Sequence, residues 1–220
     1  MIDFDKLINS HLNREFKPKQ IGRYYPSEIG NCLRKVWFTY KHPKELDKEK
    51  LKVFQVGLML HDFISEVLRS EKTPDVRLIQ SEVPFRLNFP EFQVSGRVDD
   101  VLIVERDNKK LLVEVKSTKL LSMVKKPSLP HVMQIQLYMH ALRIPDGMIL
   151  YVEKPSLKTI QYEIKYDPEL VKQILERFQN LHSSLKSESI PDPEAKLKKE
   201  MEWMCRYCEY VDECKNAKNV

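Results

Sequence analysis

Two short apolar runs that carry charged residues constrain this fold more than any other feature of the chain. The runs VDDVLIV and LLVEVKS have the composition of buried β-strands, yet they contain Asp99, Glu114 and Lys116. An unpaired carboxylate or ammonium inside a protein costs roughly several kcal/mol, so such groups persist when they pair with one another or bind a metal. The two runs therefore predict a sheet with either a buried ion pair or a metal site at its centre.

The spacing of these residues predicts how they meet. Apart from Glu114, residues 111–115 are apolar on both faces, which is typical of a central strand, and the period of two places Glu114 and Lys116 on one face. The sequence ERDNKK predicts a hairpin turn near residues 107–108, which would bring Asp99 close to the end of the next strand. Two carboxylates and a lysine suit Mg²⁺ or Mn²⁺, although a buried salt bridge explains them equally well.

A helix predicted over residues 47–71 supplies a third candidate ligand. Its apolar residues recur at steps of three, four and seven, which predicts one stripe facing the core, formed by Leu51, Phe54, Leu58, His61 and Leu68. A histidine on such a stripe is more often an ordinary core residue. Together with the two carboxylates, His61 becomes a candidate nitrogen ligand for a divalent metal.

Three of the four cysteines form a tight cluster in the sequence. In WMCRYCEYVDEC, the residues Cys205, Cys208 and Cys214 follow a C-x2-C-x5-C spacing, while Cys32 lies far away. Four thiolates suit Zn²⁺ or an iron-sulfur cluster, and their number does not separate the two, although zinc is the commoner occupant. Disulfides fit less well, because no signal peptide opens the chain and 220 residues provide an ample core.

Length and composition narrow the class of protein. The 220 residues predict one domain, or one domain with an appendage, and the net charge of +5 allows nucleic-acid binding. No apolar run approaches the roughly 20 residues that span a bilayer, so we expect a soluble, cytoplasmic protein. The chain has no glycine-rich phosphate loop, which excludes a built-in NTPase motor.

Hydrophobic periodicity predicts an α/β fold with a mixed sheet. Helices are expected over residues 3–14, 47–71, 129–143 and 168–186, and strands over residues 77–87, 92–104, 111–117, 148–152 and 159–165. In addition, Ser27 is expected to cap a turn that leads into a helix through Arg34, Trp37 and Tyr40. We divide the chain into a helical segment over 1–46 that contributes Cys32, a core over 47–190, and a C-terminal cap over 191–220. The cap is expected to return to Cys32, so that the cysteines join the two ends of the chain.

The motifs in their order carry a resemblance to a known family. The segments SEIGNCLRKVWF, GLMLHDFISEVL, GRVDDVLI, LLVEVKST, QIQLY and CRYCEYVDEC resemble the RecB-type nucleases of the PD-(D/E)xK superfamily. In particular, they are similar to the CRISPR-associated RecB-like exonucleases, the fourth Cas protein family. Val98 stands where the eponymous proline would be, which matches the GxxD form of RecB-type members. Asp99 fits the spacing from Gly96, whereas the adjacent Asp100 should point to the opposite face.

The resemblance implies a fold and a set of site residues. The order αβββαβ matches the core of this nuclease superfamily, here with a C-terminal iron-sulfur cap. The implied metal ligands for Mn²⁺ or Mg²⁺ are His61, Asp99, Glu114 and the backbone carbonyl of Val115, with Lys116 as the catalytic lysine. The implied ligands of an iron-sulfur cluster, with 4Fe-4S ahead of 2Fe-2S, are Cys32, Cys205, Cys208 and Cys214. Implied DNA contacts are Gln134 and Tyr138 of the QxxxY element, together with Arg34 and Lys35.

The function that the resemblance implies is a metal-dependent DNA nuclease. It would be a single-strand exonuclease, with endonuclease activity also open, that processes DNA ends for CRISPR spacer acquisition. Its implied partners are DNA with single-stranded ends and the CRISPR integrase complex, and a homo-oligomer is also open. Two alternatives are a DNA-end-binding adaptor of the integration complex and a free-standing RecB-like repair or viral nuclease. The intact set of candidate catalytic residues argues against the adaptor.

Overall fold

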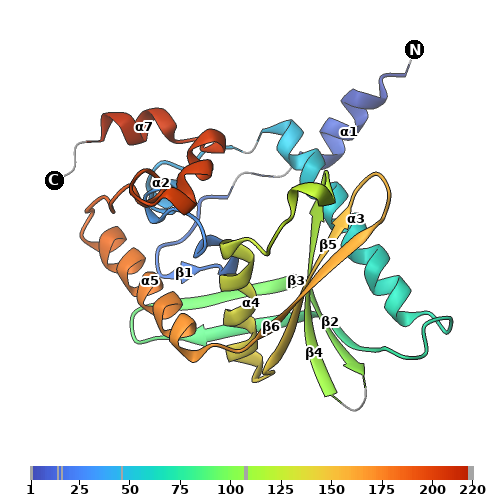
Figure 1. Cartoon of the computed structure of the whole chain (residues 1–220). Helices are drawn as coiled ribbons and strands as arrows, with labels where there is room; N and C mark the ends of the chain where they lie inside the picture. The colour runs from blue at the N-terminus through green and yellow to red at the C-terminus, as the bar shows by residue number, and fades with distance from the viewer. Residues whose placement is uncertain (1, 14, 16, 46, 107–108, 218–220) are drawn as a thin grey trace.

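The structure of the 220-residue chain is a computed structural model. It describes residues 2–13, 15, 17–45, 47–106 and 109–217, except for the side chains of residues 82, 97–103, 105 and 106. Within these residues a six-stranded mixed sheet is flanked by helices, which confirms the predicted α/β fold class (Figure 1). None of the described helices combines the length and the apolar composition needed to cross a membrane.

The sheet has a long antiparallel part and a parallel crossover. Its strands are β1 (Arg23–Tyr24), β2 (Arg77–Asn88), β3 (Gln93–Arg106), β4 (Lys109–Thr118), β5 (Asp146–Glu153) and β6 (Thr159–Lys165). They follow the order β1-β3-β4-β5-β6, with β2 paired to β3. β4 pairs with β3 on one side and runs parallel to β5 on the other, so it is the central strand that its apolar run predicted.

The helices begin where the sequence provides caps. Within the described residues they are α1 (Phe4–Leu12), η1 (Pro26–Glu28), α2 (Leu33–Lys41), α3 (Lys48–Arg69), η2 (Leu121–Met123), α4 (Leu129–Leu142), α5 (Pro168–Lys186), α6 (Glu194–Leu197), η3 (Lys199–Tyr207) and α7 (Val211–Asn216). The carboxylate of Asp47 accepts the first backbone N–H groups of α3, and that of Asp167 does the same for α5. Local capping therefore determined these boundaries.

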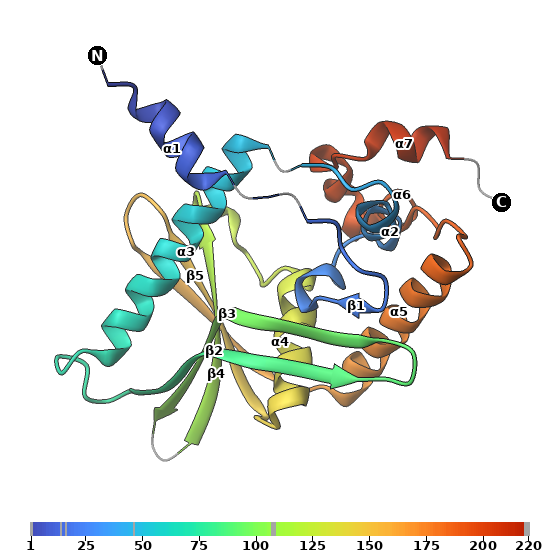
Figure 2. The same cartoon turned by 180° about the vertical axis from the view of Figure 1, so that it is seen from behind.

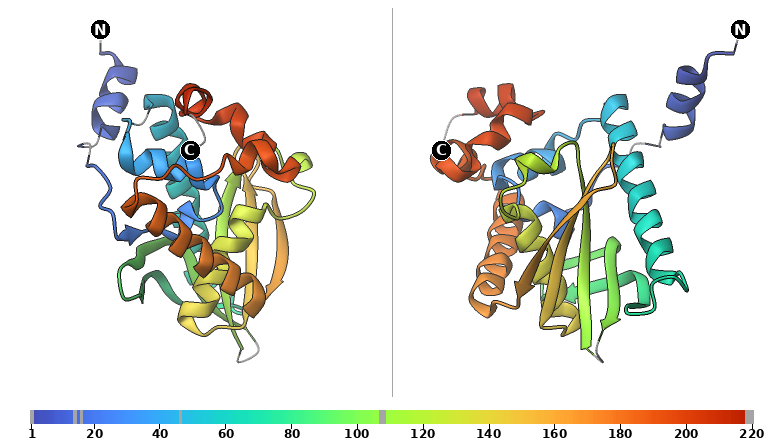
Figure 3. Two further views of the ribbon diagram at one scale, coloured as in Figure 1. Left: turned by 90° about the vertical axis from the view of Figure 1, so that its left-hand side faces the viewer. Right: turned by 45° about the vertical axis from the view of Figure 1, so that its right-hand side comes forward.

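Helices cover both faces of the sheet. Figure 3 shows α3 on one side, with α4 and α5 on the other. The alternation along β4 follows these layers, because Leu112 packs into the core beneath α4 whereas Val113 and Val115 pack against α3. By the period of two, Glu114 shares the face of Leu112.

The buried stripe of α3 differs from the prediction. Leu60 and His61 are buried and Leu68 packs against the sheet, but Phe54 is 54% exposed. The N-terminal half of α3 extends beyond the sheet edge (Figure 2), so its apolar side chains have no core to enter. Leu58 lines a cleft instead of the core. The periodicity identified the helix correctly, but the assignment of Phe54 to the core was wrong.

The middle of β3 is irregular. Its register with β2 shifts between Ser81 and Val83, so that residues 99–101 of β3 lie opposite the single residue 82. β1 pairs with the start of β3, and β4 pairs with β3 from Val101 onward. The bulge in β3 therefore lies between the part of β3 that pairs with β1 and the part that pairs with β4. Bulges are common beside active sites.

The C-terminal segment returns to the N-terminal part of the chain, as predicted. In Figures 1 and 2, α6, η3 and α7 lie close to α2, the helix that begins immediately after Cys32. Arg177 of α5 donates to both carboxylate oxygens of Glu194, at 2.6 and 3.0 Å. Glu194 also accepts the backbone N–H of Leu33 at 3.0 Å. This one carboxylate thus joins α5, α2 and the cap.

Candidate active site

Glu114 and Lys116 form a close ion pair on the central strand. The ammonium Nζ of Lys116 is 2.6 Å from Oε1 of Glu114, and the carboxylate is completely buried. The two side chains lie on the same face, as the period of two predicted. A buried salt bridge and a site that awaits a cation both fit this pair.

Asp99 lies near this pair along the backbone. Val101 is opposite Glu114 in the antiparallel ladder, and Asp99 is two residues further along β3, within the bulge. The last ladder pair joins Arg106 to Lys109, and residues 107–108, for which a turn was predicted, lie outside the described part. The side chains of Asp99 and Asp100 also lie outside it, and the choice between them stays a prediction.

His61 is held inside the protein by α3. It is 4% exposed, and Nδ1 lies 3.9 Å from a carboxylate oxygen of Asp62. α3 contacts both β3 and β4, and Leu60 packs on Val115 within one hydrophobic cluster. The fold therefore brings the helix of His61 onto the two strands that contain the other predicted ligands, including the backbone of Val115.

A large cleft opens beside Lys116. Its volume is about 1240 Å³, and its lining includes Val115, Lys116, Ser117 and His131 on one wall. The first half of α3, the segment before α2 and residues 43–45 after α2 supply most of the rest, and the cleft continues to Tyr210 in the cap. The predicted catalytic lysine therefore faces a space large enough for a substrate segment.

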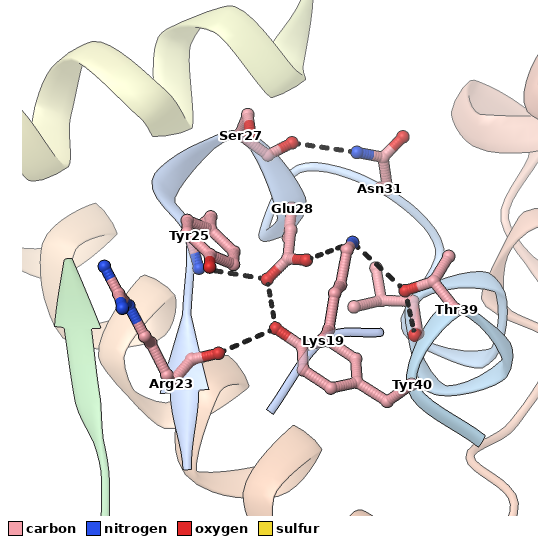
Figure 4. Close-up of polar contacts among 9 residues, drawn as sticks. Lys19, Arg23, Tyr25, Ser27, Glu28, Asn31, Thr39 and Tyr40 are labelled. Atoms are coloured by element: carbon pink, nitrogen blue, oxygen red, sulfur yellow. Dashed lines mark hydrogen bonds and ion pairs between the residues drawn. The ribbon is translucent and has the colours of Figure 1, made fainter. Parts of the chain in front are cut away.

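A buried carboxylate fixes the wall of the cleft near α2, as Figure 4 shows. Glu28 accepts from Lys19, from the backbone N–H of Tyr25 at 3.0 Å and from the hydroxyl of Tyr40 at 2.9 Å. Lys19 also donates to Thr39 at 3.2 Å, and both residues line the cleft. Burial and then the charge of Glu28 raise the pKa of Tyr40 far above its usual range, so its hydroxyl stays protonated. The network holds the segment before α2 rigidly against that helix.

The same segment also docks on α4. A Cβ atom added to Gly30 would lie 2.3 Å from the Cα of Pro130, so only glycine permits this approach. Pro130 directly precedes His131, which lines the cleft. The backbone contact at Gly30 thus places the Glu28 network next to the first turn of α4.

Gln134 and Tyr138 meet on one face of α4, as their spacing predicted. The side-chain amide of Gln134 donates to the Tyr138 hydroxyl at 3.0 Å. They are only 6% and 3% exposed, and Tyr138 packs edge-on against Phe85. As placed, they support the site from inside the protein and offer little surface for the predicted DNA contact.

The sequence analysis missed His131 and Tyr151. His131 lies in the first turn of α4, and Nδ1 is 2.8 Å from the hydroxyl of Tyr151 on β5. The available signal was that His131 stands one turn before Gln134, on the same side of one helix. Tyr151 gave no comparable signal, because only the parallel pairing of β4 with β5 places it opposite Lys116.

The four cysteines line a second, small cavity of about 30 Å³, which also contains Arg34. All four carry free thiols. Burial, followed by the neighbouring thiols of Cys32 and Cys214, raises the pKa of Cys205, and burial likewise raises that of Cys208. These thiols would therefore be protonated without a ligand, and a metal or cluster bound here would have to stabilise their thiolate forms.

Burial leaves Arg34 little surface for the predicted DNA contact, and the contact predicted for Lys35 stays a prediction. Arg34 is 2% exposed, and its guanidinium donates to the carbonyl oxygen of Pro191 at 2.6 Å and lies 4.0 Å from the Sγ atom of Cys214. Lys35 pairs with Glu209 at 3.4 Å and lines the same cavity. The return of the cap onto α2 thus encloses Arg34 at the cysteine cavity, while Lys35 keeps 27% of its side-chain surface exposed.

The predicted ligand residues suit a divalent metal and an iron-sulfur cluster by the chemistry of their donor atoms, although not, within the part of the chain that the structure describes, by their arrangement. Among the described residues, no group of three or more His, Cys, Asp or Glu side chains is arranged to hold a metal ion, the cysteines included. A buried carboxylate and a buried imidazole are nevertheless donors that Mg²⁺ or Mn²⁺ accepts, and four thiols around one cavity suit zinc or an iron-sulfur cluster. The residues therefore fit these groups by donor chemistry.

The chain matches one protein family in sequence and is similar to several solved structures in fold. The sequence model of the PD-(D/E)XK nuclease superfamily matches residues 13–215. In fold, the chain is similar to the crystal structure of SSO0001, with a TM-score of 0.61, 21% identity, and 94% of this chain and 91% of that chain covered. It is also similar to an alkaline exonuclease, LHK-Exo, from Laribacter hongkongensis, with a TM-score of 0.51, 11% identity, and coverage of 87% and 95%. No curated protein matches the chain in sequence.

Proposed function

Because the chain belongs to the PD-(D/E)XK nuclease superfamily, we propose that it is a metal-dependent DNA exonuclease whose active site is the cleft beside Lys116. The observation that carries this proposal is the fully buried Glu114 with Lys116 at 2.6 Å, at the wall of a cleft of about 1240 Å³. A purely structural ion pair has no need of such a cleft.

The residues of the site would divide the work of phosphodiester hydrolysis. His61, Asp99, Glu114 and the carbonyl of Val115 would hold Mg²⁺ or Mn²⁺, which when bound supplies a Lewis acid and a more acidic water. Lys116 would position the attacking water and stabilise the negative charge that develops on the phosphate. Gln134 and Tyr138, which are buried, would support α4 from inside the protein and so help to position the DNA strand beside it.

We further propose that Cys32, Cys205, Cys208 and Cys214 hold an iron-sulfur cluster, with 4Fe-4S ahead of 2Fe-2S. Their common cavity supports a thiolate-binding group there. The resemblance to the CRISPR-associated RecB-like exonucleases supports iron over zinc. The group would join the cap to α2 and so close the far end of the cleft near Tyr210.

The same resemblance supports a cellular role. The nuclease would trim DNA with single-stranded ends for CRISPR spacer acquisition, in association with the CRISPR integrase complex. A free-standing exonuclease outside CRISPR is the second candidate, and the fold similarity to an alkaline exonuclease favours it. Integrase genes beside the gene for this chain would distinguish the first from the second.

Cleavage of end-labelled single- and double-stranded DNA tests the proposed function. Wild type and Glu114→Ala would be compared with Mn²⁺, Mg²⁺ or EDTA, and the visible absorption spectrum recorded on the same preparations. We expect metal-dependent stepwise shortening by a brown wild-type protein and none by Glu114→Ala. Wild type that binds DNA but never cleaves it would indicate an adaptor. A colourless protein that cleaves DNA would indicate that the four cysteines bind zinc instead of an iron-sulfur cluster.

A further inference from the structure

His131 and Tyr151 form a pair beside the proposed catalytic lysine, and the proposed reaction gives them no role. Tyr151 lies opposite Lys116 in the parallel ladder between β4 and β5. Its hydroxyl is 2.8 Å from Nδ1 of His131, and the two rings are tilted against each other with centroids 5.6 Å apart. His131 and Lys116 line the same cleft. The pair is therefore fixed by packing and open to a substrate.

The Tyr151 hydroxyl determines which nitrogen of His131 carries the proton. The backbone N–H of Ser128 donates to the hydroxyl oxygen at 3.1 Å. Within the described part of the chain, the hydroxyl proton then has Nδ1 of His131 as its acceptor. An imidazole that accepts at Nδ1 carries its own proton on Nε2. Among the described residues Nε2 makes no hydrogen bond, so its N–H is the donor that His131 can offer to the cleft.

The surroundings of His131 keep the imidazole neutral. Burial and then the charge of Lys116 lower the pKa of His131 to about 3. Burial also raises the pKa of Tyr151, so the hydroxyl remains protonated and able to donate. A neutral N–H donor next to Lys116 can bind an anionic oxygen without adding a second cation that would repel the lysine.

We propose that His131 is a substrate-binding residue whose Nε2–H donates to a non-bridging oxygen of the phosphate adjacent to the scissile one. Tyr151 is the positioning residue that holds the required tautomer. This inference rests on the proposed nuclease function, since it needs a DNA strand in the cleft. A hydrogen bond to a charged group contributes about 10- to 100-fold in affinity or rate.

α4 contains a matched control at its other end. Nδ1 of His140 lies 2.8 Å from the hydroxyl of Tyr166, the same pair at the same distance on the same helix. His131 belongs to the described lining of the cleft and His140 does not. Any general effect of losing a histidine–tyrosine contact from α4 should therefore appear equally at both ends.

The test compares steady-state DNA cleavage by matched variants. His131→Leu should lower kcat/KM by about 10- to 100-fold, and Tyr151→Phe should lower it less, because the histidine can still reach the donating tautomer. His131→Gln should recover part of the loss, since its amide also donates. His140→Leu and Tyr166→Phe should cleave at the wild-type rate. Thermal melting and circular dichroism would show which variants remain folded.

A modified substrate identifies the contact itself. A methylphosphonate at one flanking position replaces the charged non-bridging oxygen by a methyl group. At the contacted position, wild type should lose about the same factor as His131→Leu does on normal DNA, and His131→Leu should lose nothing further. At the other positions the two losses should multiply.

Two results would overturn this inference. One is an equal loss of kcat/KM in His131→Leu and His140→Leu, and the other is independent losses from His131→Leu and the methylphosphonate at every flanking position. Failure of the proposed function looks different. In that case wild type would not cleave DNA with any divalent metal, or Lys116→Ala would keep the full rate.

Discussion

At the scale of single residues, the need to balance the buried charge of Glu114 explains why Lys116 lies next to it. Glu114 has no exposed surface, and such a carboxylate is tolerated only with a cation close by. Lys116 provides that cation at 2.6 Å. A divalent metal bound by Glu114 would take over part of this role and leave the ammonium available to the substrate. The ion pair and the proposed metal site would therefore be two states of the same residues.

This exchange of partners predicts that Lys116→Ala separates metal binding from catalysis. The variant should still bind Mn²⁺, because the lysine is not a ligand, while its cleavage rate falls by about 10²- to 10³-fold through loss of charge stabilisation. Isothermal titration with Mn²⁺ and single-turnover cleavage measure the two effects. Lys165→Ala is the control, because this exposed lysine of β6 pairs with Asp146. A Lys116→Ala protein that cleaves normally would refute the assignment.

At the scale of secondary-structure elements, a few polar anchors hold the helices around the cleft. The carboxylate of Glu28 joins the segment before α2 to that helix, and the carboxylate of Glu194 joins the cap to α5 and α2. Each of these acids accepts several hydrogen bonds at once, which offsets the cost of its burial. The walls of the cleft thus depend on contacts between elements that are distant in sequence.

The anchor at Glu194 should make the cap sensitive to acid. Burial acts to raise the pKa of Glu194, but hydrogen bonds from Arg177 and Leu33 and the charge of Lys198 outweigh it, so the folded-state pKa lies below the usual 4.5. The stabilisation is therefore complete above about pH 4.5 and is lost as the pH falls through the folded-state pKa. Glu194→Gln should be about 3 kcal/mol less stable at pH 7, and the difference should shrink below pH 4.5.

Urea unfolding between pH 3 and pH 7 measures this dependence. Glu188→Gln is the matched control, because its ion pair with Lys41 at 2.8 Å is on the surface. That substitution should change the free energy of unfolding little at any of these pH values. A Glu194→Gln protein with the same stability as wild type at pH 7 would show that the anchor is not needed.

At the scale of the whole molecule, the C-terminal cap and the start of α2 meet at the cysteine cavity. Cys32 is the residue immediately before α2, and the other three cysteines belong to the cap. A small hydrophobic cluster contains Cys32 and Met201, with Cys205 packed against it, whereas Cys208 and Cys214 pack against the main core. A group bound by the four thiols would therefore stabilise the cap and its contact with α2 directly, and the sheet only through the main core.

Loss of that group should loosen the cap first. Because binding of a metal or cluster by thiolates is coupled to folding, its removal should expose residues 191–217 and α2 while β4 and α4 stay protected. Hydrogen exchange followed by mass spectrometry, on protein before and after oxidative cluster removal, measures this directly. Treatment with EDTA under conditions that strip only Mn²⁺ is the control. Uniform protection across the chain after cluster removal would contradict the expected order.

Most of the long helices and strands, and the pairing of charges along one strand, could be predicted from the sequence, whereas short elements such as β1 and α7 could not. Alternation places Glu114 and Lys116 on one face of β4, and the caps at Asp47 and Asp167 begin α3 and α5, because these signals act between near neighbours. The order of the motifs was enough to predict the nuclease superfamily, which the match over residues 13–215 confirms.

Only the tertiary structure decided which side chains line the cleft and which are buried. Phe54 follows the helical stripe yet is exposed, and Arg34 looks like a surface cation yet is enclosed by the cap. The contact of His131 with Tyr151 likewise depends on the parallel pairing of β4 with β5. Exposure is set by what packs against a residue from elsewhere in the chain, and local periodicity carries no information about that partner.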